Sequence, residues 1–472
     1  MTTFMRRLSV IALVIMAFAT LSCPAATHYV VPPGEESGTP ADPYTSWETA
    51  GTNIIEVAFA AQTNDAPRTI WVTNGTYYPT NFIGVTNEMK IKSVNGYTNT
   101  ILNGALAGTN RCIYLNLSSG DSLFRGFTVT NYHMTTYQNA AILANYASIF
   151  DCLIAGNATS YGYGAGLYVF NSTISNCIVR GNSSGRFGGG LSLGNNCIML
   201  DSVIEENTCG GFGGGAIHSN GDGVLVSNCA IINNRHAGNA TSMGGGGIIC
   251  YNVAGTRTFV DCVITGNTST VSGGGVFGYT VGGYGTFINC KIVGNSASNS
   301  GGGIGSTLGT KNLNLRNCLI AENYASTNGG GILFVTATNI VENCTIVSNY
   351  AGKVGGGMYL EASGSFTNNI IYHNTAGVSA ANFYNAAGNL GLDYSCVSPA
   401  VDGTANITED PRLDPAGADY RLRHGSPCIN KGGNMDWMMN TVDLDNNMRK
   451  RYGTVDIGAY EKIIQGSVFS GR

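Results

Sequence analysis

One group of charged residues in this chain has the types that acid–base chemistry requires. Asp201, Glu205 and Glu206 stand close together, and Arg180 and Arg186 precede them. Two carboxylates at a suitable separation can hydrolyse a glycosidic bond, and an arginine beside calcium-bound carboxylates can act as a base toward a sugar ring. These three acids are therefore the catalytic candidates. The interpretation that the sequence favours is plainer, namely a solvated rim in which charges pair between neighbouring segments.

A second group of charges lies near the end of the chain and could bind a cation. Asp443 and Asp445 offer oxygen ligands of the kind that calcium prefers. Arg449, Asp456 and Glu461 follow them, so an ion-pair network that fixes the C-terminal part is the favoured interpretation. The sequence predicts no cofactor, with calcium as the alternative.

Aromatic residues recur at outward positions of the strand that follows each glycine triplet. Such rings can stack on sugars, although on an exposed sheet they also serve as plain strand formers. The candidate ligand contacts are Tyr168, Phe277, Tyr279 and Tyr359. The same alternation places Ile217 outward and His218 inward, which predicts a buried histidine.

The elements that position these residues come from a repeat. A motif whose fullest form is Asn/Asp-Cys-x-Ile-x-x-Asn recurs nine times, at intervals of 25 to 33 residues. Period-two alternation marks its Cys-x-Ile part as a strand with cysteine and isoleucine on the inward face. A glycine triplet and another apolar strand follow most copies. The motif ends at Asn157, Asn182, Asn207, Asn234, Asn267, Asn295, Asn323, Asn349 and Asn374.

Segments of this length cannot enclose a core alone, so they must stack as coils of a solenoid. We therefore predict an all-β fold, a right-handed parallel β-helix of about 11–12 coils. Each terminal asparagine is expected to adopt the left-handed backbone of a tight turn and to bond to the same residue in the next coil. A helix from Ser46 to Gln62 is expected to cap the open edge of the first coil.

An apolar stripe runs along the outside of the rod, beside the inward cysteine column. Lys291 and Thr345 interrupt it. Because such a stripe is seldom left bare, we expect the C-terminal segment to fold over part of it, with contact to a partner as the second interpretation. The stripe consists of Leu153, Ile178, Val203, Ala230, Val263, Leu319 and Ile370.

The chain has 14 cysteines, of which seven occupy the inward column. Equivalent residues of parallel strands stay near strand spacing, beyond comfortable disulfide reach, so we predict reduced, buried thiols. Cys396 and Cys428 lie outside the column, and a bridge between them is left open. Cysteine and histidine spacings of zinc sites are absent from the sequence.

The two ends of the sequence and its charge suggest where the protein acts. Arg6 and Arg7, the apolar run from Leu8 to Leu21 and two following alanines have the layout of a signal peptide over residues 1–26. Lipid attachment at Cys23 is the less favoured alternative. No other run is apolar enough to span a membrane. The net charge of −4 and the lack of basic blocks argue against nucleic acid as a partner.

The predicted organisation is a β-helix with its cap over residues 27–388, a C-terminal segment over 389–461 and a tail over 462–472. Residues Gly425-Ser426-Pro427-Cys428-Ile429-Asn430 and Asp456-Ile457-Gly458-Ala459-Tyr460-Glu461 resemble the choice-of-anchor Q segment that closes many exported bacterial β-helix proteins. The glycine triplets and strands that end in asparagine resemble the repeats of polymorphic outer-membrane adhesins. These resemblances imply a pectin-lyase-like fold and a place outside the cell or at its surface.

Two classes of function follow from these observations. The favoured one is an exported, monomeric binding or structural module for polysaccharide or cell-surface glycan, because the predicted strands carry few acids. The alternative is a lyase or glycoside hydrolase that acts on extracellular polysaccharide, which fold analogy supports only weakly. Catalytic turnover that disappears in Glu205→Gln or Glu206→Gln would decide for the alternative.

Overall fold

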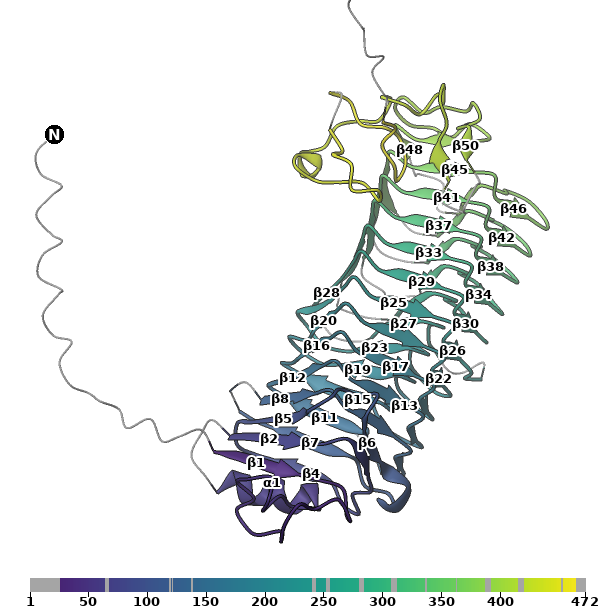
Figure 1. Ribbon diagram of the computed structural model, residues 1–472. Coiled ribbons are helices and arrows are strands. Elements are labelled where there is room, and N and C mark those ends of the chain that lie inside the picture. Colours follow the sequence, from purple (N-terminus) through teal and green to yellow (C-terminus); the bar gives the residue numbers. More distant parts are fainter. Residues whose placement is uncertain are drawn as a thin grey trace, which may run out of the picture.

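The computed structural model describes residues 26–63, 68–118, 120, 122–136, 139–239, 243–251, 255–279, 284–306, 312–335, 338–361, 363–386, 392–414, 420–450 and 453–463. The predicted signal peptide apart from Ala26, including Cys23, lies outside these residues, as does the tail beyond Ile463. The described chain winds into a right-handed parallel β-helix, which confirms the predicted fold class. Figure 1 shows the coils stacked into a rod from its purple end to its green end.

Four long parallel sheets, A to D, contain 14, 13, 12 and 10 strands, close to the predicted number of coils. Sheet A runs from β1 (Thr27–Val30) to β48 (Leu392–Asp393), and sheet D from β10 (His133–Met134) to β46 (Thr375–Ala376). The strands of sheet B are β3 (Gly75–Tyr77), β6 (Thr100–Asn103), β9 (Thr128–Thr130), β13 (Leu153–Ala155), β17 (Ile178–Arg180), β21 (Val203–Glu205), β25 (Ala230–Ile232), β29 (Val263–Thr265), β33 (Lys291–Val293), β37 (Leu319–Ala321), β41 (Thr345–Val347), β45 (Ile370–Tyr372) and β49 (Cys396–Val397). The strands of sheet C are β4 (Ile83–Val85), β7 (Ile113–Asn116), β11 (Ile142–Asn145), β15 (Leu167–Phe170), β19 (Leu191–Leu193), β23 (Ile217–Ser219), β27 (Ile248–Tyr251), β31 (Val276–Tyr279), β35 (Ile304–Ser306), β39 (Ile332–Phe334), β43 (Met358–Leu360) and β47 (Phe383–Asn385).

The cysteine and isoleucine columns of the repeat both face the interior, as the alternation predicts. Cys152, Ile154, Cys262 and Ile264 are completely buried and belong to one apolar cluster that extends through the rod. Neighbouring strands pair in register, so each inward residue stacks on its equivalent in the next coil. The core is therefore a set of parallel side-chain columns, and every coil depends on its neighbours for burial.

The asparagines that end the repeats form a hydrogen-bonded ladder inside the rod, here called the Asn ladder. Asn267 Oδ1 accepts from the backbone nitrogen and the side-chain amide of Asn234 at 2.9 and 3.0 Å. The prediction of a left-handed backbone at these asparagines is wrong. It occurs one residue earlier, for example at Gly156 and Gly181 with φ of 64° and 61°, and this bend directs the following asparagine inward.

A second set of left-handed residues precedes the inward cysteines and faces outward. These residues, here called the turn column, have φ values from 49° to 60°, a region that asparagine and aspartate tolerate better than most residues. The turn column consists of Asp151, Asn176, Asp201, Asn228, Asp261, Asn289, Asn317, Asn343 and Asn368.

The glycine triplets form the corner between sheets D and C. A Cβ atom at Gly274 would collide with the carbonyl oxygen of Gly302 in the next coil. Only glycine lets two backbones approach this closely, so the triplets set the tight stacking of the corner.

One strand of sheet C is displaced by a residue from its predicted alternation. Ile217 belongs to the core cluster, and His218 pairs with the outward Ser192. The expected outward Ile217 and inward His218 are therefore both wrong. The cause is one additional residue in this coil between Gly210 and Gly213, so that residues 214–216 take the places of the triplet.

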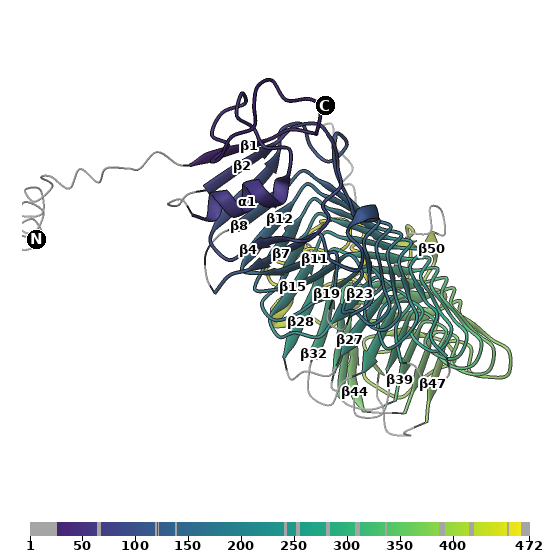
Figure 2. The same ribbon diagram turned by 90° about the horizontal axis from the view of Figure 1, so that it is seen from below.

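The N-terminal cap is shorter than the predicted helix. α1 (Ile54–Gln62) begins after Asn53, whose side chain accepts from the Ile55 N–H at 3.0 Å. Gly51 instead donates to the carbonyl oxygen of Tyr29 in β1, and the residues directly before it form bends and turns. Figure 2 shows α1 lying across the first coil, where its apolar face covers the open edge. Among the helices of the described ranges, none has the length and apolar character needed to cross a bilayer.

The C-terminal segment folds back over the outward stripe of sheet B, which confirms the predicted cover. Leu319 and Ile370 of the stripe pack with Leu413, Tyr420 and other residues of that segment in a second apolar cluster. β50 (Leu413–Asp414) and β51 (Arg421–Leu422) form a small antiparallel pair there. Figure 1 shows this yellow segment at the end of the rod opposite α1. Toward β29 the stripe is open, and Val263 is 39% exposed.

The described cysteines are free and buried, in agreement with the prediction for the inward column. Burial raises the pKa of Cys197, Cys209 and Cys229 to about 12, so thiolates scarcely form at neutral pH. Cys396 and Cys428 are also free, and both belong to the cluster under the C-terminal segment.

Candidate functional site

The acids selected from the sequence lie at two different places around one coil. Asp201 belongs to the turn column before β21, and its Oδ1 accepts from the side-chain amide of Asn228 at 2.7 Å. Glu205 ends β21 and lies 3.6 Å from Arg180 on β17, in an ion pair whose side chains are 27% and 50% exposed. Glu206 follows at an exposed turn with φ of 57°.

This arrangement does not form an acid pair suited to glycoside hydrolysis. At about 3.3 Å per residue the backbones of Asp201 and Glu205 lie at most roughly 13 Å apart, and their carboxylates bond to different partners, Asn228 and Arg180. The two carboxyl groups of glycosidases need about 5–9.5 Å. Arg186 is also separate, because its guanidinium lies 4.9 Å from the ring of Phe187. The geometry therefore supports the charged rim, in which Arg180 and Glu205 pair between coils.

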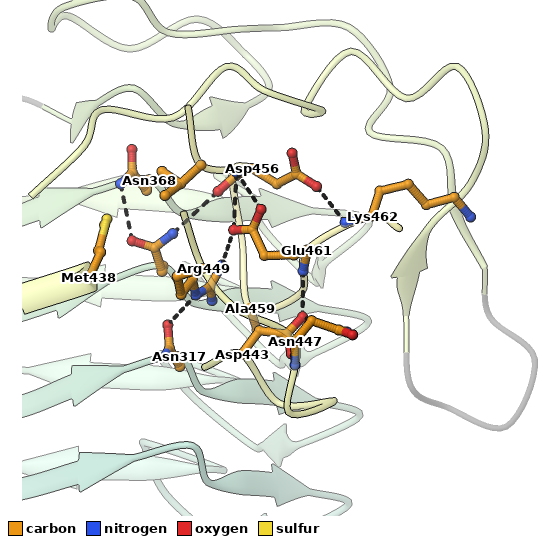
Figure 3. A network of polar contacts seen from close by, with 12 residues as sticks. Asn317, Asn368, Met438, Asp443, Asn447, Arg449, Asp456, Ala459, Glu461 and Lys462 are labelled. Carbon is orange, nitrogen blue, oxygen red and sulfur yellow. Dashed lines mark hydrogen bonds and ion pairs between the residues drawn. The ribbon is translucent and has the colours of Figure 1, made fainter. Parts of the chain in front are cut away.

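One of the two candidate calcium ligands, Asp443, takes part in a buried network of the C-terminal segment (Figure 3). Asp443 Oδ1 accepts from the backbone nitrogens of Asp445 and Asn447, and its Oδ2 accepts from that of Glu461 at 2.6 Å. Asp445 instead forms two hydrogen bonds with Arg421 at 2.6 and 2.7 Å. N–H donors thus occupy both carboxylates, and no group of acids, histidines or cysteines suited to a metal occurs in the ranges described above.

Arg449 is the cation at the centre of this network. Its side chain is completely buried, with Nη1 2.9 Å from Glu461 and Nε 2.8 Å from Asn317 on the rod. Asp456 accepts from the backbone nitrogens of Asn430 and Lys462, both at 2.6 Å. One guanidinium therefore faces several buried carboxylates, and it ties the segment to the turn column. Figure 3 shows these contacts converging between the segment and the end of the rod.

The excess of buried carboxylates predicts a stability that falls as pH rises. Burial raises the pKa of Glu461 from 4.5 to about 7, against the opposing effect of Arg449, and burial also raises the pKa of Asp456. The folded protein then binds the proton of Glu461 more tightly than the unfolded chain does. This contribution is complete below pH of about 4.5 and is lost as pH rises through about 7.

The measurement compares the free energy of unfolding of the wild type and Glu461→Gln at about pH 5 and pH 8. The wild type is expected to lose on the order of 2 kcal/mol relative to the variant over this range. The comparison cancels the titration of groups outside this network. A difference that stays constant, or that grows in the opposite direction, would contradict the prediction.

The outward side of sheet C presents a row of rings, here called the aromatic row. Tyr163 and Phe187 lie in the corner before the sheet and are joined by a backbone bridge. The Tyr163 ring lies 5.0 Å from Tyr168 and 4.5 Å from Phe187, measured between ring centroids. His218 is 4.9 Å from Phe187 and 5.2 Å from Tyr251. Tyr251 lies 5.4 Å from Tyr279. The aromatic row thus extends without interruption from β15 to β31.

His218 serves this row as a neutral aromatic ring. Its Nδ1 is 2.9 Å from the Ser192 hydroxyl, and burial, helped by the charge of Arg257, lowers its pKa to about 3. The sequence prediction of a buried histidine was therefore right, although the predicted side of the sheet was wrong. A histidine that stays neutral over the physiological range is poorly suited to act as a general base.

A separate pair of rings marks the last two strands of sheet C and is called the tyrosine pair. Tyr359 and Tyr384 stack with centroids 5.1 Å apart, and the Tyr359 hydroxyl donates to Glu361 Oε1 at 2.9 Å. Tyr384 is 36% exposed, and sheet C has no further described strand beyond it. One side of this pair is therefore open to solvent.

The predicted aromatic contacts differ in how much of each ring is accessible. Tyr168 and Phe277 are 7% and 3% exposed, so a ligand has little surface to reach on either. Tyr279 and Tyr359 are half-buried. Tyr163, Phe187 and Tyr384 were not among the residues predicted from the sequence. The first two could have been found, because each stands directly before a glycine of the repeat.

Comparisons with known proteins agree with the fold. The family described as right handed beta helix region matches residues 239–390. Among solved structures, the chain is similar to pectate lyase Pel9A, with 15% identity over 93% of this chain and 96% of that chain and a TM-score of 0.42. It is also similar to the A-module of mannuronan C-5 epimerase AlgE4 from Azotobacter vinelandii, with 12% identity over 72% and 93% and a TM-score of 0.37.

A third similar structure is the catalytic domain of a GH87 α-1,3-glucanase in complex with nigerose, with 13% identity over 78% of this chain and 69% of that chain and a TM-score of 0.34. No curated protein sequence matches the chain. At these levels of identity the similarities concern the fold alone.

Proposed function

We propose that this protein is an exported, rod-shaped module that binds polysaccharide along the outward side of sheet C. The observation that carries the proposal is the aromatic row together with the tyrosine pair on the same sheet. Half-buried Tyr251 and Tyr279 combine an apolar ring with a polar hydroxyl, the combination that suits a sugar with apolar faces and polar edges. The signal-like N-terminal sequence supports export.

Binding without cleavage is favoured by the distribution of acids on this sheet. The described strands of sheet C carry no carboxylate, and Glu361, which directly follows β43, bonds to Tyr359. Both hydrolase and lyase chemistry need more than a single acid at the site. Tyr279 and Tyr384 are separated by four coils, roughly 19 Å, so a long glycan chain could contact both.

The experiment tests binding and turnover together. The mature protein is incubated with plant, algal and host polysaccharides, with and without calcium, and both retention and release of reducing or unsaturated ends are followed. Tyr279→Ala and Tyr384→Ala are each expected to weaken binding about fivefold, on the basis of about 1 kcal/mol per aromatic contact. Tyr78→Ala is the control, since Tyr78 is 50% exposed but lies near the N-terminal cap.

Two outcomes would overturn the proposal. Release of products from any polysaccharide would establish the enzymatic alternative and identify its substrate. Absence of binding across the panel, or equal loss of binding in all three variants, would show that sheet C is not a glycan surface.

A further inference from the structure

A cavity of about 320 Å³ lies at the seam between the rod and the C-terminal segment. The rod contributes Asp261 and Asn289 of the turn column together with Val263 and Lys291 of sheet B. Leu444 and Asn446 of the C-terminal segment form the opposite wall. Cavities of this size at the junction of two parts of a protein are common sites for small ligands.

Asp261 differs from the rest of the turn column in its bonding. The other members are joined in pairs through their side chains, as in Asn176 with Asp151 and Asn228 with Asp201, both at 2.7 Å. The later pairs are Asn317 with Asn289 at 3.1 Å and Asn368 with Asn343 at 3.0 Å. Within the described chain, the exposed carboxylate of Asp261 has neither a hydrogen-bond nor an ion-pair partner. It lies between two bonded pairs, at the wall of the cavity.

Lys291 is the second unusual residue of the wall. It stands in the outward column of sheet B, where it pairs with Val263 and Leu319. Most coils carry an apolar residue at this position, which either contacts the C-terminal segment or faces solvent. Val263 and Leu444 flank the polar groups and provide an apolar surface. The cavity thus combines a carboxylate, an ammonium group, carboxamides and an apolar wall.

We infer that this seam cavity binds a single pyranose residue that has adjacent hydroxyl groups. The Asp261 carboxylate would accept from two neighbouring hydroxyls, Lys291 would donate to a hydroxyl or ring oxygen, and the Asn446 amide can do either. Val263 and Leu444 would contact the C–H face of the ring. The volume accommodates one sugar residue rather than a chain. The inference rests on the proposed function, since it assumes that the protein binds carbohydrate.

The site is separate from the aromatic surface of sheet C, because it opens on the turn between sheets A and B. The protein would therefore have two separate carbohydrate subsites. One binds extended polysaccharide along sheet C, and the other holds one sugar residue where the C-terminal segment meets the rod.

The test measures binding of methyl glucoside, methyl galactoside and methyl mannoside to the full chain by saturation-transfer NMR. At least one is expected to bind with a Kd on the order of 1 mM. Asp261→Asn and Lys291→Met should each weaken it by about tenfold or more. Asparagine occupies the same turn position at Asn228 and Asn289, so the first variant keeps the left-handed backbone. Asp151→Asn changes an equivalent residue far from the cavity and should bind as the wild type does.

Polysaccharide binding is measured on the same samples to separate the two proposals. Loss of glycoside binding in the two cavity variants, with polysaccharide binding retained, supports the inference. Polysaccharide binding without glycoside binding, or glycoside binding that is equal in all variants, overturns the inference about the cavity. The proposed function is not affected by either result. If the wild type binds neither ligand, both proposals fail.

Discussion

Replacing Arg449 with methionine is expected to release the C-terminal segment from the rod. The guanidinium is completely buried and bonds to Glu461 of the segment and Asn317 of the rod, so its loss leaves Asp443, Asp456 and Glu461 without a compensating charge. Removing one partner of a buried ion pair typically costs about 3–5 kcal/mol. Hydrogen exchange followed by mass spectrometry should show faster exchange throughout residues 428–461.

The matched control is Arg423→Met. Arg423 pairs with Asp414 at 3.3 Å, but the two side chains are 58% and 47% exposed, and pairs of this kind contribute about 0–1 kcal/mol. Exchange in the segment should therefore stay at the wild-type rate. If Arg449→Met exchanged no faster than this control, the network would not be what holds the segment in place.

Replacing Asn267 with alanine is expected to break the rod near its middle. Asn267 Nδ2 donates to the carbonyl oxygen of Ile231 at 2.9 Å and to Asn295 Oδ1 at 3.0 Å, while its Oδ1 accepts twice from Asn234. Alanine would leave the buried backbone N–H of Asn234 without its acceptor and would remove one hydrogen bond each from the Asn234 amide, which keeps Ile204 and Ile232, and from the Ile231 carbonyl. At about 1–3 kcal/mol for the unsatisfied N–H and about 1 kcal/mol for each of the two lost bonds, the expected loss is roughly 4 kcal/mol.

Because coils contact only their neighbours, this loss should be local. Exchange should accelerate first in the coils around Asn267 and later toward the ends. Asn176→Gly is the control, because it removes an exposed carboxamide at φ of 52°, which glycine adopts without strain. A melting temperature that falls equally in both variants would show that burial of the Asn ladder adds nothing to stability.

The repeat was sufficient to predict the coils. Cys152 and Ile154 are two residues apart in a strand, so both had to face the same side, and the recurrence of this spacing fixed the core columns of sheet B. The apolar outward stripe likewise predicted a cover from outside the repeat. In both cases an energetic requirement was visible in one sequence segment, namely burial of apolar surface.

Local geometry was harder to predict from the sequence. One additional residue before Gly213 shifted the strand that carries His218 by one residue, and a shift of one residue exchanges the two faces of a strand. The start of α1 at Ile54 depended on a backbone bond between Gly51 and Tyr29, which joins separate segments. Such long-range contacts leave no mark in a local pattern.

The candidate sites were predicted only in part. Asp201 and Glu205 are close in the sequence but lie at opposite ends of β21, where they meet Asn228 and Arg180. The aromatic row depends on Tyr163 and Phe187, which belong to a corner and not to a strand. The unpartnered Asp261 became distinctive only when the pairing of its neighbours was known.

The reach of the C-terminal segment has a consequence for how this rod can change in length. The segment bonds to Asn317, Asn343 and Asn368 of the turn column, which belong to three successive coils. If one of those coils were duplicated or deleted, the asparagines that bond to the segment would no longer lie at the spacing that the segment requires. The coils nearer to α1, beyond the reach of the segment, depend on contacts with their neighbours. Related proteins should therefore vary in coil number near the middle of the rod, while the number of coils that bond to the segment stays constant.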